Sequence, residues 1–189
     1  MQTVKKTNNN NKNYKNNNNA KKYEYQERLY ITSLLEMNIA LYPNQIGENK
    51  TRENLQKIIT NTIEGKCIRE GYVQPKSVRI NHYSSGIVKG ELIEFNVVFV
   101  CNTSNPVEGT HIQCTVKSVT KAGIHAEAFD SEGNIPISLF VARDHFVKNP
   151  QFQKVKETDV IMINVIGTRF EMNDDCIEVL GELINPKKY

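Results

Sequence analysis

The chain has 189 residues, 24% of them charged and 39% hydrophobic, with a formal net charge of +3 at pH 7. This length allows one large or two small domains, each with a modest core. No run approaches the roughly 18 apolar residues of a membrane-spanning helix, and the N-terminus lacks the apolar segment of a signal peptide. We therefore expect an intracellular protein without a membrane partner.

The net charge divides unevenly along the chain. Residues 1–22 contain six lysines, no acidic residue and two asparagine runs, so they carry +6, while residues 23–189 carry −3. A segment with nothing apolar to bury is expected to be disordered. This Asn/Lys-rich arm is either a polycationic contact for RNA or DNA, or a by-product of an AT-rich genome. Because the remainder has no net basic charge, any nucleic-acid contact there must be local.

The first ordered half, residues 23–104, is predicted to be an α+β domain. Tyr23–Ala40 is predicted to form a long strand. Leu55, Ile59 and Ile63 recur at helical spacing, with Thr51 as the predicted N-cap and Gly65 just past the helix end. Alternation then predicts three antiparallel strands, at Cys67–Val73, Ser77–Tyr83 and Glu91–Cys101.

The second half, residues 105–189, is predicted to be a five-stranded OB barrel. In the segment from Pro106 to Glu127, apolar and polar residues alternate up to Val116, and the alternation slips at Ser118 as a β-bulge would cause. Such a curved hairpin, with its second strand at Ile124–Ala128, is typical of the start of an OB barrel. The remaining predicted elements are a strand at Ile135–Ser138, a short helix at Leu139–Phe146, a polar loop at 148–158, a strand at Val160–Ile166 that continues or bends at Gly167–Arg169, a turn at Met172–Asp175, and a closing strand at Cys176–Leu183.

No catalytic constellation emerges from the sequence. The four histidines have no HExxH or HxH spacing, and the chain lacks GxSxG and P-loop motifs. Glu91 and Glu94 lie on different faces of their strand, so they are not a general acid/base pair. The cysteines have no CxxC spacing, which favours reduced, buried thiols over disulfides or zinc: Cys67, Cys101, Cys114 and Cys176. We expect a non-enzymatic chain with no metal, cofactor or small-molecule substrate.

Seven short segments in order resemble one family, the seventh, stalk-forming subunit of eukaryotic RNA polymerase II and its archaeal counterpart. The similarity runs from about Tyr25 to Leu183. It implies an N-terminal tip domain that docks the polymerase core and a C-terminal S-one-type OB domain that contacts nascent single-stranded RNA. The segments are Ile63–Cys67, Gly71–Val73, Gly86–Val88, Phe95–Phe99, Pro106–Gly109, Val119–Ala126 and Ile166–Arg169.

The resemblance also implies candidate site residues. Polymerase docking would use Gly65, Cys67, Gly71, Tyr72, Val73, Ser85 and Gly86, although Tyr72 and Val73 are equally explained as domain core. OB domains bind single strands on their second and third strands through aromatic stacking and a few cations. His125 occupies the family's aromatic position, and it is otherwise explained as a solvated strand residue. The accompanying cations would be Lys117, Lys121, Arg143 and Arg169.

The chain departs from this family in its N-terminal arm, which has no counterpart, and in its short 148–158 loop. These features resemble the shorter polymerase subunits of large cytoplasmic DNA viruses, and an AT-rich protist protein would look similar. A viral origin implies the host cytoplasm and the virion, and a cellular origin implies the nucleus. A second stalk subunit is left open as a partner. The alternative function is a free-standing OB-fold RNA-binding protein in translation or RNA decay.

Overall fold

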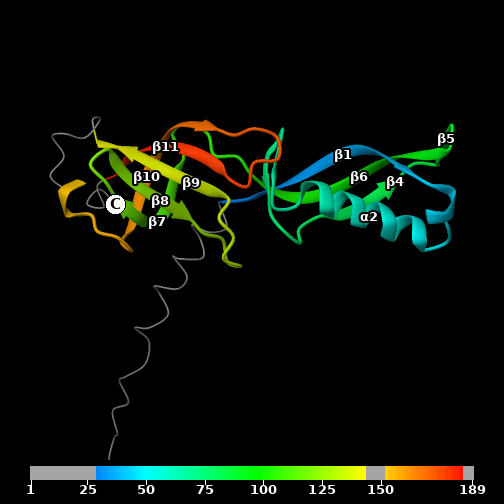
Figure 1. Ribbon diagram of the computed structural model, residues 1–189, viewed down its shortest axis with the longest axis horizontal. Helices are drawn as coiled ribbons and strands as arrows, with labels where there is room; N and C mark the ends of the chain where they lie inside the picture. The colour runs from blue at the N-terminus through cyan, green and yellow to red at the C-terminus, as the bar shows by residue number, and fades with distance from the viewer. Residues whose placement is uncertain (1–28, 144–151, 185–189) are drawn as a thin grey trace, which may run out of the picture.

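The computed structural model describes residues 29–143 and 152–184, which form two β-rich units (Figure 1). The first is an open sheet with the one α-helix of the described residues, and the second is a closed barrel. Each unit has its own cluster of buried apolar side chains. The chain passes from the sheet unit to the barrel between Ser104 and His111.

Strand β6 (Leu92–Ser104) is the centre of the open sheet. Along one side it pairs with β1 (Ile31–Leu41) over the full length of β1, from Ile31↔Thr103 to Leu41↔Ile93. Along its other side β6 pairs with three short strands in succession, so β1 forms one long edge of the sheet. The short strands are β3 (Gly71–Val73), which also pairs with β2 (Cys67–Ile68), then β4 (Arg79–Tyr83) and β5 (Ile87–Lys89).

Helix α2 (Lys50–Ile63) covers one face of this sheet, after a 3-10 turn at Pro43–Gln45. Its buried stripe of Leu55, Ile59 and Ile63 belongs to the same cluster as the inward residues of β6. The prediction that Thr51 caps the helix is wrong, because the helix begins one residue earlier, at Lys50. Thr51 lies buried in the first turn, where its hydroxyl donates to the Gly47 carbonyl oxygen at 2.9 Å.

Strands are present where they were predicted in this unit, but their boundaries differ. The first strand begins at Ile31, and Tyr23–Arg28 lie outside the described residues. Cys67–Val73 is not a single strand but the hairpin of β2 and β3, and Gly71, the first residue of β3, has φ +121°. Strand β5 was not predicted, because three residues are too few to show an alternation.

The second unit is the predicted five-stranded barrel, which is confirmed as closed and OB-like. Around the barrel the strands follow the order β10-β11-β9-β8-β7, and β10 returns to pair with β7. All neighbours are antiparallel except β9 and β11, which are parallel. The strands are β7 (His111–Val119), β8 (Gly123–Ala128), β9 (Ile137–Ala142), β10 (Val160–Arg169) and β11 (Ile177–Leu183), with a 3-10 turn at Phe152–Lys154.

The predicted bulge is confirmed, since the β7–β8 register passes from Val116↔Ala126 to Ser118↔His125 and leaves Lys117 unpaired. A second bulge, between Val165 and Gly167 of β10, stands just before the predicted bend. The predicted helix at Leu139–Phe146 is wrong for its first four residues, which belong to β9. Residues 144–146 lie outside the described residues.

The β2–β3 hairpin joins the sheet unit to the barrel through its backbone. The Cys67 amide donates to the Asp174 carbonyl at 2.7 Å, and the Asn173 amide donates to the Cys67 carbonyl at 2.8 Å. The Cys67 and Tyr72 side chains are buried with the barrel residues rather than with the sheet. The two cores therefore stay distinct, and the sheet unit reaches the barrel cluster through this hairpin and through Leu29 and Tyr30, which precede β1.

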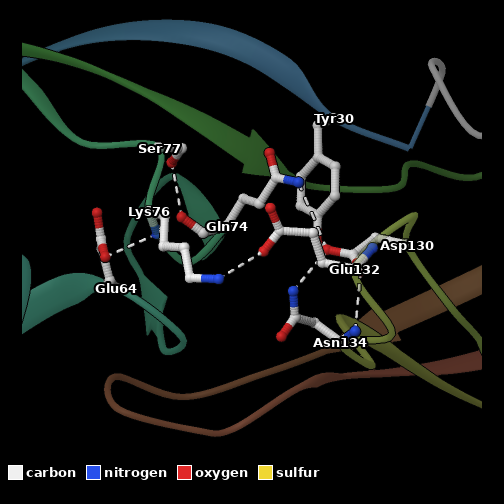
Figure 2. Close-up of polar contacts among 8 residues, drawn as sticks. All are labelled: Tyr30, Glu64, Gln74, Lys76, Ser77, Asp130, Glu132 and Asn134. Atoms are coloured by element: carbon white, nitrogen blue, oxygen red, sulfur yellow. Dashed lines mark hydrogen bonds and ion pairs between the residues drawn. The ribbon is translucent and has the colours of Figure 1, made fainter.

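A second connection centres on the carboxylate of Asp130, in the β8–β9 loop (Figure 2). Its Oδ2 accepts hydrogen bonds from the Tyr30 hydroxyl at 3.2 Å and from Gln74 at 3.4 Å, both in the sheet unit. Its Oδ1 accepts from the backbone amides of Glu132 at 2.9 Å and Asn134 at 2.8 Å. One carboxylate thus orders its own loop and ties that loop to the other unit.

Candidate nucleic-acid and docking surfaces

An aromatic pair lies on the outer surface of the second and third barrel strands. His125 of β8 and Phe140 of β9 are cross-strand partners, with ring centroids 4.7 Å apart at an interplanar angle of 50°. His125 is exposed and Phe140 is half-buried. The pair presents aromatic surface on the face where OB domains stack unpaired bases.

Phe140 was missed in the sequence because it falls within the predicted helix. The signal was nevertheless present: Ile137, Leu139 and Val141 alternate with Ser138, Phe140 and Ala142, and the first three are buried. A strand with this alternation points Phe140 outward beside His125.

Two predicted cations lie at the turn end of this pair. Lys121 is exposed in the β7–β8 turn, and no ion-pair partner is found for it among the described residues. Arg143 is already engaged: its backbone amide donates to Ala122 O at 2.9 Å, its Nη2 donates to Thr120 O at 2.8 Å, and its guanidinium lies 5.0 Å from the Phe152 ring centroid. Arg143 therefore holds the turn against the end of β9, and Lys121 remains exposed.

The other two predicted cations are placed differently. Lys117, the bulged residue of β7, has its Nζ 3.2 Å from Glu127 Oε2 and 6.0 Å from the Phe129 ring centroid. Arg169, at the end of β10, has its Nη2 3.4 Å from Glu171 Oε1. Arg169 of β10 pairs with Glu178 of β11, and β10 is not a neighbour of β8, the strand that carries His125. The structure therefore gathers Lys121, His125 and Arg143 and leaves Arg169 apart.

Most residues predicted to dock the polymerase are covered by the chain itself. Cys67 and Val73 are fully buried and Tyr72 is 4% exposed. A Cβ on Gly71 would lie 2.2 Å from the Ser104 carbonyl oxygen, which leaves room for no side chain. Gly65, at φ +72°, closes helix α2. These five positions hold the fold and the connection to the barrel, so their side chains offer a partner little surface.

Ser85 and Gly86 are exposed and lead directly into an apolar area that we call the distal patch, made of Tyr42, Ile87 and Val88. Their exposed fractions are 56%, 61% and 73%. Ile93 of β6 pairs with Leu41 on one side and with Val88 on the other, so the end of β1 and β5 lie at the same end of the sheet with β6 between them. In Figure 1, β5 stands at the end of the sheet unit farthest from the barrel. Of the predicted docking residues, Ser85 and Gly86 are exposed, and the distal patch that follows them in the chain was not predicted.

Burial keeps the thiols of this chain neutral. It raises the pKa of Cys67 and of Cys114 to about 12 and the pKa of Cys101 to about 11, with nearby acidic groups adding to the effect at Cys67 and Cys101. All four cysteines are free. No group of three potential metal ligands occurs within residues 29–143 and 152–184.

No protein-family model matches the chain. No curated protein matches it significantly. Within the part of the chain that the structure describes, no helix is long and apolar enough to cross a membrane.

Proposed function

We propose that this chain is a non-catalytic, stalk-type subunit of a multisubunit DNA-directed RNA polymerase. In this proposal the sheet unit is the tip domain that docks the polymerase core, and the barrel is an S-one-type OB domain that contacts nascent RNA. The observation that carries it is the separation of two different surfaces along the chain. An exposed apolar patch lies at the distal end of the sheet unit, and an outward aromatic pair lies on the barrel.

The distal patch has the character of a protein contact. Tyr42, Ile87 and Val88 expose large apolar side chains at the same end of the sheet, and exposed apolar surface on a small domain marks interaction sites. The ion pair of Lys89 with Glu94, 2.6 Å between charged atoms, borders the patch as a polar rim. Exposed apolar side chains with a charged pair at their border suit docking to a large preformed complex.

The barrel surface has the character of a weak single-strand contact. Stacking on His125 and Phe140 is available to any base, and base–aromatic stacking contributes about 1–3 kcal/mol per base. Among the four predicted cations, Lys117, Arg143 and Arg169 already have intramolecular partners. Contact should thus depend more on stacking than on phosphate neutralisation, which suits a surface that holds a passing transcript loosely.

The docking half of the proposal is tested by Val88→Asp. This change puts a charge on the most exposed residue of the distal patch, and we expect the tagged chain to lose the large polymerase subunits on purification. Val107→Asp is the matched control, because Val107 is 64% exposed on the barrel side of the chain. Retention of the polymerase by Val88→Asp, with Val107→Asp behaving identically, would remove the distal patch from the docking account.

The RNA half is tested by the double variant His125→Ala, Phe140→Ala in the assembled polymerase. We expect ultraviolet crosslinking of nascent RNA to this chain to fall several-fold. Leu180→Ala is the control: Leu180 of β11 pairs with Phe140 of β9, is 37% exposed and has no ring. Adding Lys121→Ala should lower crosslinking further, and undiminished crosslinking in the triple variant would mean that RNA passes elsewhere.

The alternative, a free-standing OB-fold protein of translation or RNA decay, would use the same aromatic pair. Under this alternative, unlike the stalk function, the distal patch would contact no polymerase. Size-exclusion chromatography of native extract separates the two functions: a stalk subunit elutes with a very large complex, and a free-standing protein elutes near 21.6 kDa.

A further inference from the structure

The outer edge of β1 is the longest unpaired strand edge among the described residues. Strand β1 has 11 residues, and each pairs with β6 on one side only. On its other side no strand is found within residues 29–143 and 152–184. The barrel has no such edge because its ring of strands is closed.

The backbone groups that face this open edge can be identified from β6. The Ser84 amide donates to Asn96 O and the Gln74 amide donates to Asn102 O, each at 2.9 Å, on the side of β6 away from β1. Backbone groups alternate sides along a strand, so odd-numbered residues of β6 face β1. The register pairs odd with odd, as in Leu35↔Phe99. Even-numbered residues of β1 therefore direct their N–H and C=O groups to the open edge: Thr32, Leu34, Glu36, Asn38 and Ala40.

This edge lacks the features that usually prevent strand pairing. Natural edge strands are short, bulged, interrupted by proline, charged, or covered by another element. Strand β1 contains no proline, its register with β6 has no shift, and its one charged residue is Glu36. All five even-numbered residues are exposed, and Leu34 is 63% exposed. A long and regular edge of this kind is expected to be covered in the working protein.

We propose that the open edge of β1 accepts an extended segment of a partner polypeptide by β-strand addition. Main-chain bonds to the even-numbered residues would supply affinity, and side chains on the sheet face opposite α2 would supply specificity. An apolar residue of the partner would lie beside Leu34 and its neighbour Val100. A lysine or arginine would lie opposite Glu36, whose carboxylate accepts from the Asn96 side chain and has no cationic partner among the described residues.

A second copy of this chain fits the edge less well. Antiparallel pairing of two β1 strands about their common centre places Glu36 opposite Glu36 of the other copy, and like charges directly opposite destabilise a strand pair. A different chain can instead place a cation there. The inference does not rest on the polymerase assignment, because the open edge is a property of the sheet whichever complex the chain joins.

Residue-resolved hydrogen exchange tests the proposal, because strand addition protects alternate amides. In the isolated full chain, the odd-numbered amides of β1 should exchange slowly and those of Leu34, Glu36 and Asn38 rapidly. In the complex purified through a tag on the full chain, these three amides should slow at least ~10-fold while the odd-numbered ones stay unchanged. Unchanged rates in the complex would overturn the proposal. Slow exchange of these three amides already in the isolated chain would also overturn the proposal, because a second copy or residues 1–28 would then cover the edge.

Proline variants separate backbone pairing from side-chain docking. Glu36→Pro removes an outward N–H and leaves the β1–β6 bonds intact, since edge strands tolerate proline at such positions. We expect it to release the partner while the odd-numbered amides remain slow. Glu36→Gln keeps the N–H and should retain the partner. Leu35→Pro removes an inward N–H and therefore shows how the loss of a β1–β6 hydrogen bond affects partner binding and amide exchange. Retention of the partner by Glu36→Pro with slow odd-numbered amides would exclude strand addition.

Discussion

The two units of this chain differ in how the backbone groups of their outermost strands are paired. Each must pair the backbone of its strands, and the barrel does so by closing β10 onto β7, whereas the sheet unit leaves β1 open. The barrel consequently presents only side chains to its surroundings, such as His125 and Phe140. The sheet unit presents an unpaired backbone as well as the distal patch. Closure suits a surface for transient contact, and an open sheet suits lasting contact with other polypeptides.

The largest effects are expected from cavities in the two cores. Ile59 of α2 and Ile163 of β10 are both fully buried, in different clusters. Truncation of either to alanine should lower the free energy of unfolding by about 2–5 kcal/mol. If the units are thermodynamically separate, Ile59→Ala will speed amide exchange in the sheet only, and Ile163→Ala in the barrel only. Equal acceleration in both units by either variant would show one cooperative structure.

The outcome of that comparison depends on a contact that the sequence could not reveal. The alternation of Ile112, Cys114 and Val116 predicted a barrel strand, and the slip at Ser118 predicted its bulge, because both are local patterns. Cys67 and Tyr72 pack into the barrel cluster rather than into their own sheet. This packing is decided by pairing with residues about one hundred positions away along the chain. Local pattern was also ambiguous for Leu139–Ala142, where one apolar run fits a helix or a strand. The openness of β1 is likewise invisible in sequence, because it depends on which strands lie beside it.

The next largest effect is expected at Gly71, in the hairpin that links the units. An alanine there would combine φ +121° with a Cβ 2.2 Å from a backbone oxygen, so we expect a loss of about 3 kcal/mol in urea-induced unfolding. Gly90→Ala is the matched control: Gly90 also has positive φ, at +62°, but a Cβ meets nothing within 4 Å. That variant should lose only about 1 kcal/mol. Similar losses in both variants would mean that strain, and not the close approach to Ser104, limits position 71.

The connection at Asp130 should make stability depend on pH. Burial by itself would raise the pKa of this carboxyl, but hydrogen bonds from Asn134, the Glu132 amide and Tyr30 outweigh it and hold the pKa below its ordinary value of 3.8. Because the folded state binds the proton less readily than the unfolded state, this carboxylate stabilises the fold above that pH and ceases to do so as the pH falls further. Asp130→Asn should lose about 1–3 kcal/mol at pH 7 and weaken the acid dependence. Glu132→Gln, which alters only an exposed ion pair, should keep the wild-type pH profile.

The smallest effects are expected from the barrel lysines, and they distinguish a phosphate contact from a surface ion pair. Lys117 is already neutralised by Glu127, whereas Lys121 stands in the β7–β8 turn beside the aromatic pair with no ion-pair partner among the described residues. Both changes to alanine should alter the free energy of unfolding by less than about 1 kcal/mol. In RNA binding they should differ: Lys121→Ala should lower the slope of log affinity against log salt by about 1, as expected for one lost phosphate contact, and Lys117→Ala should leave it nearly unchanged. Filter binding with a single-stranded oligonucleotide over a salt series measures both slopes. A larger change of the salt slope in Lys117→Ala than in Lys121→Ala would place the RNA backbone along the bulge of β7 and move the contact away from His125 and Phe140.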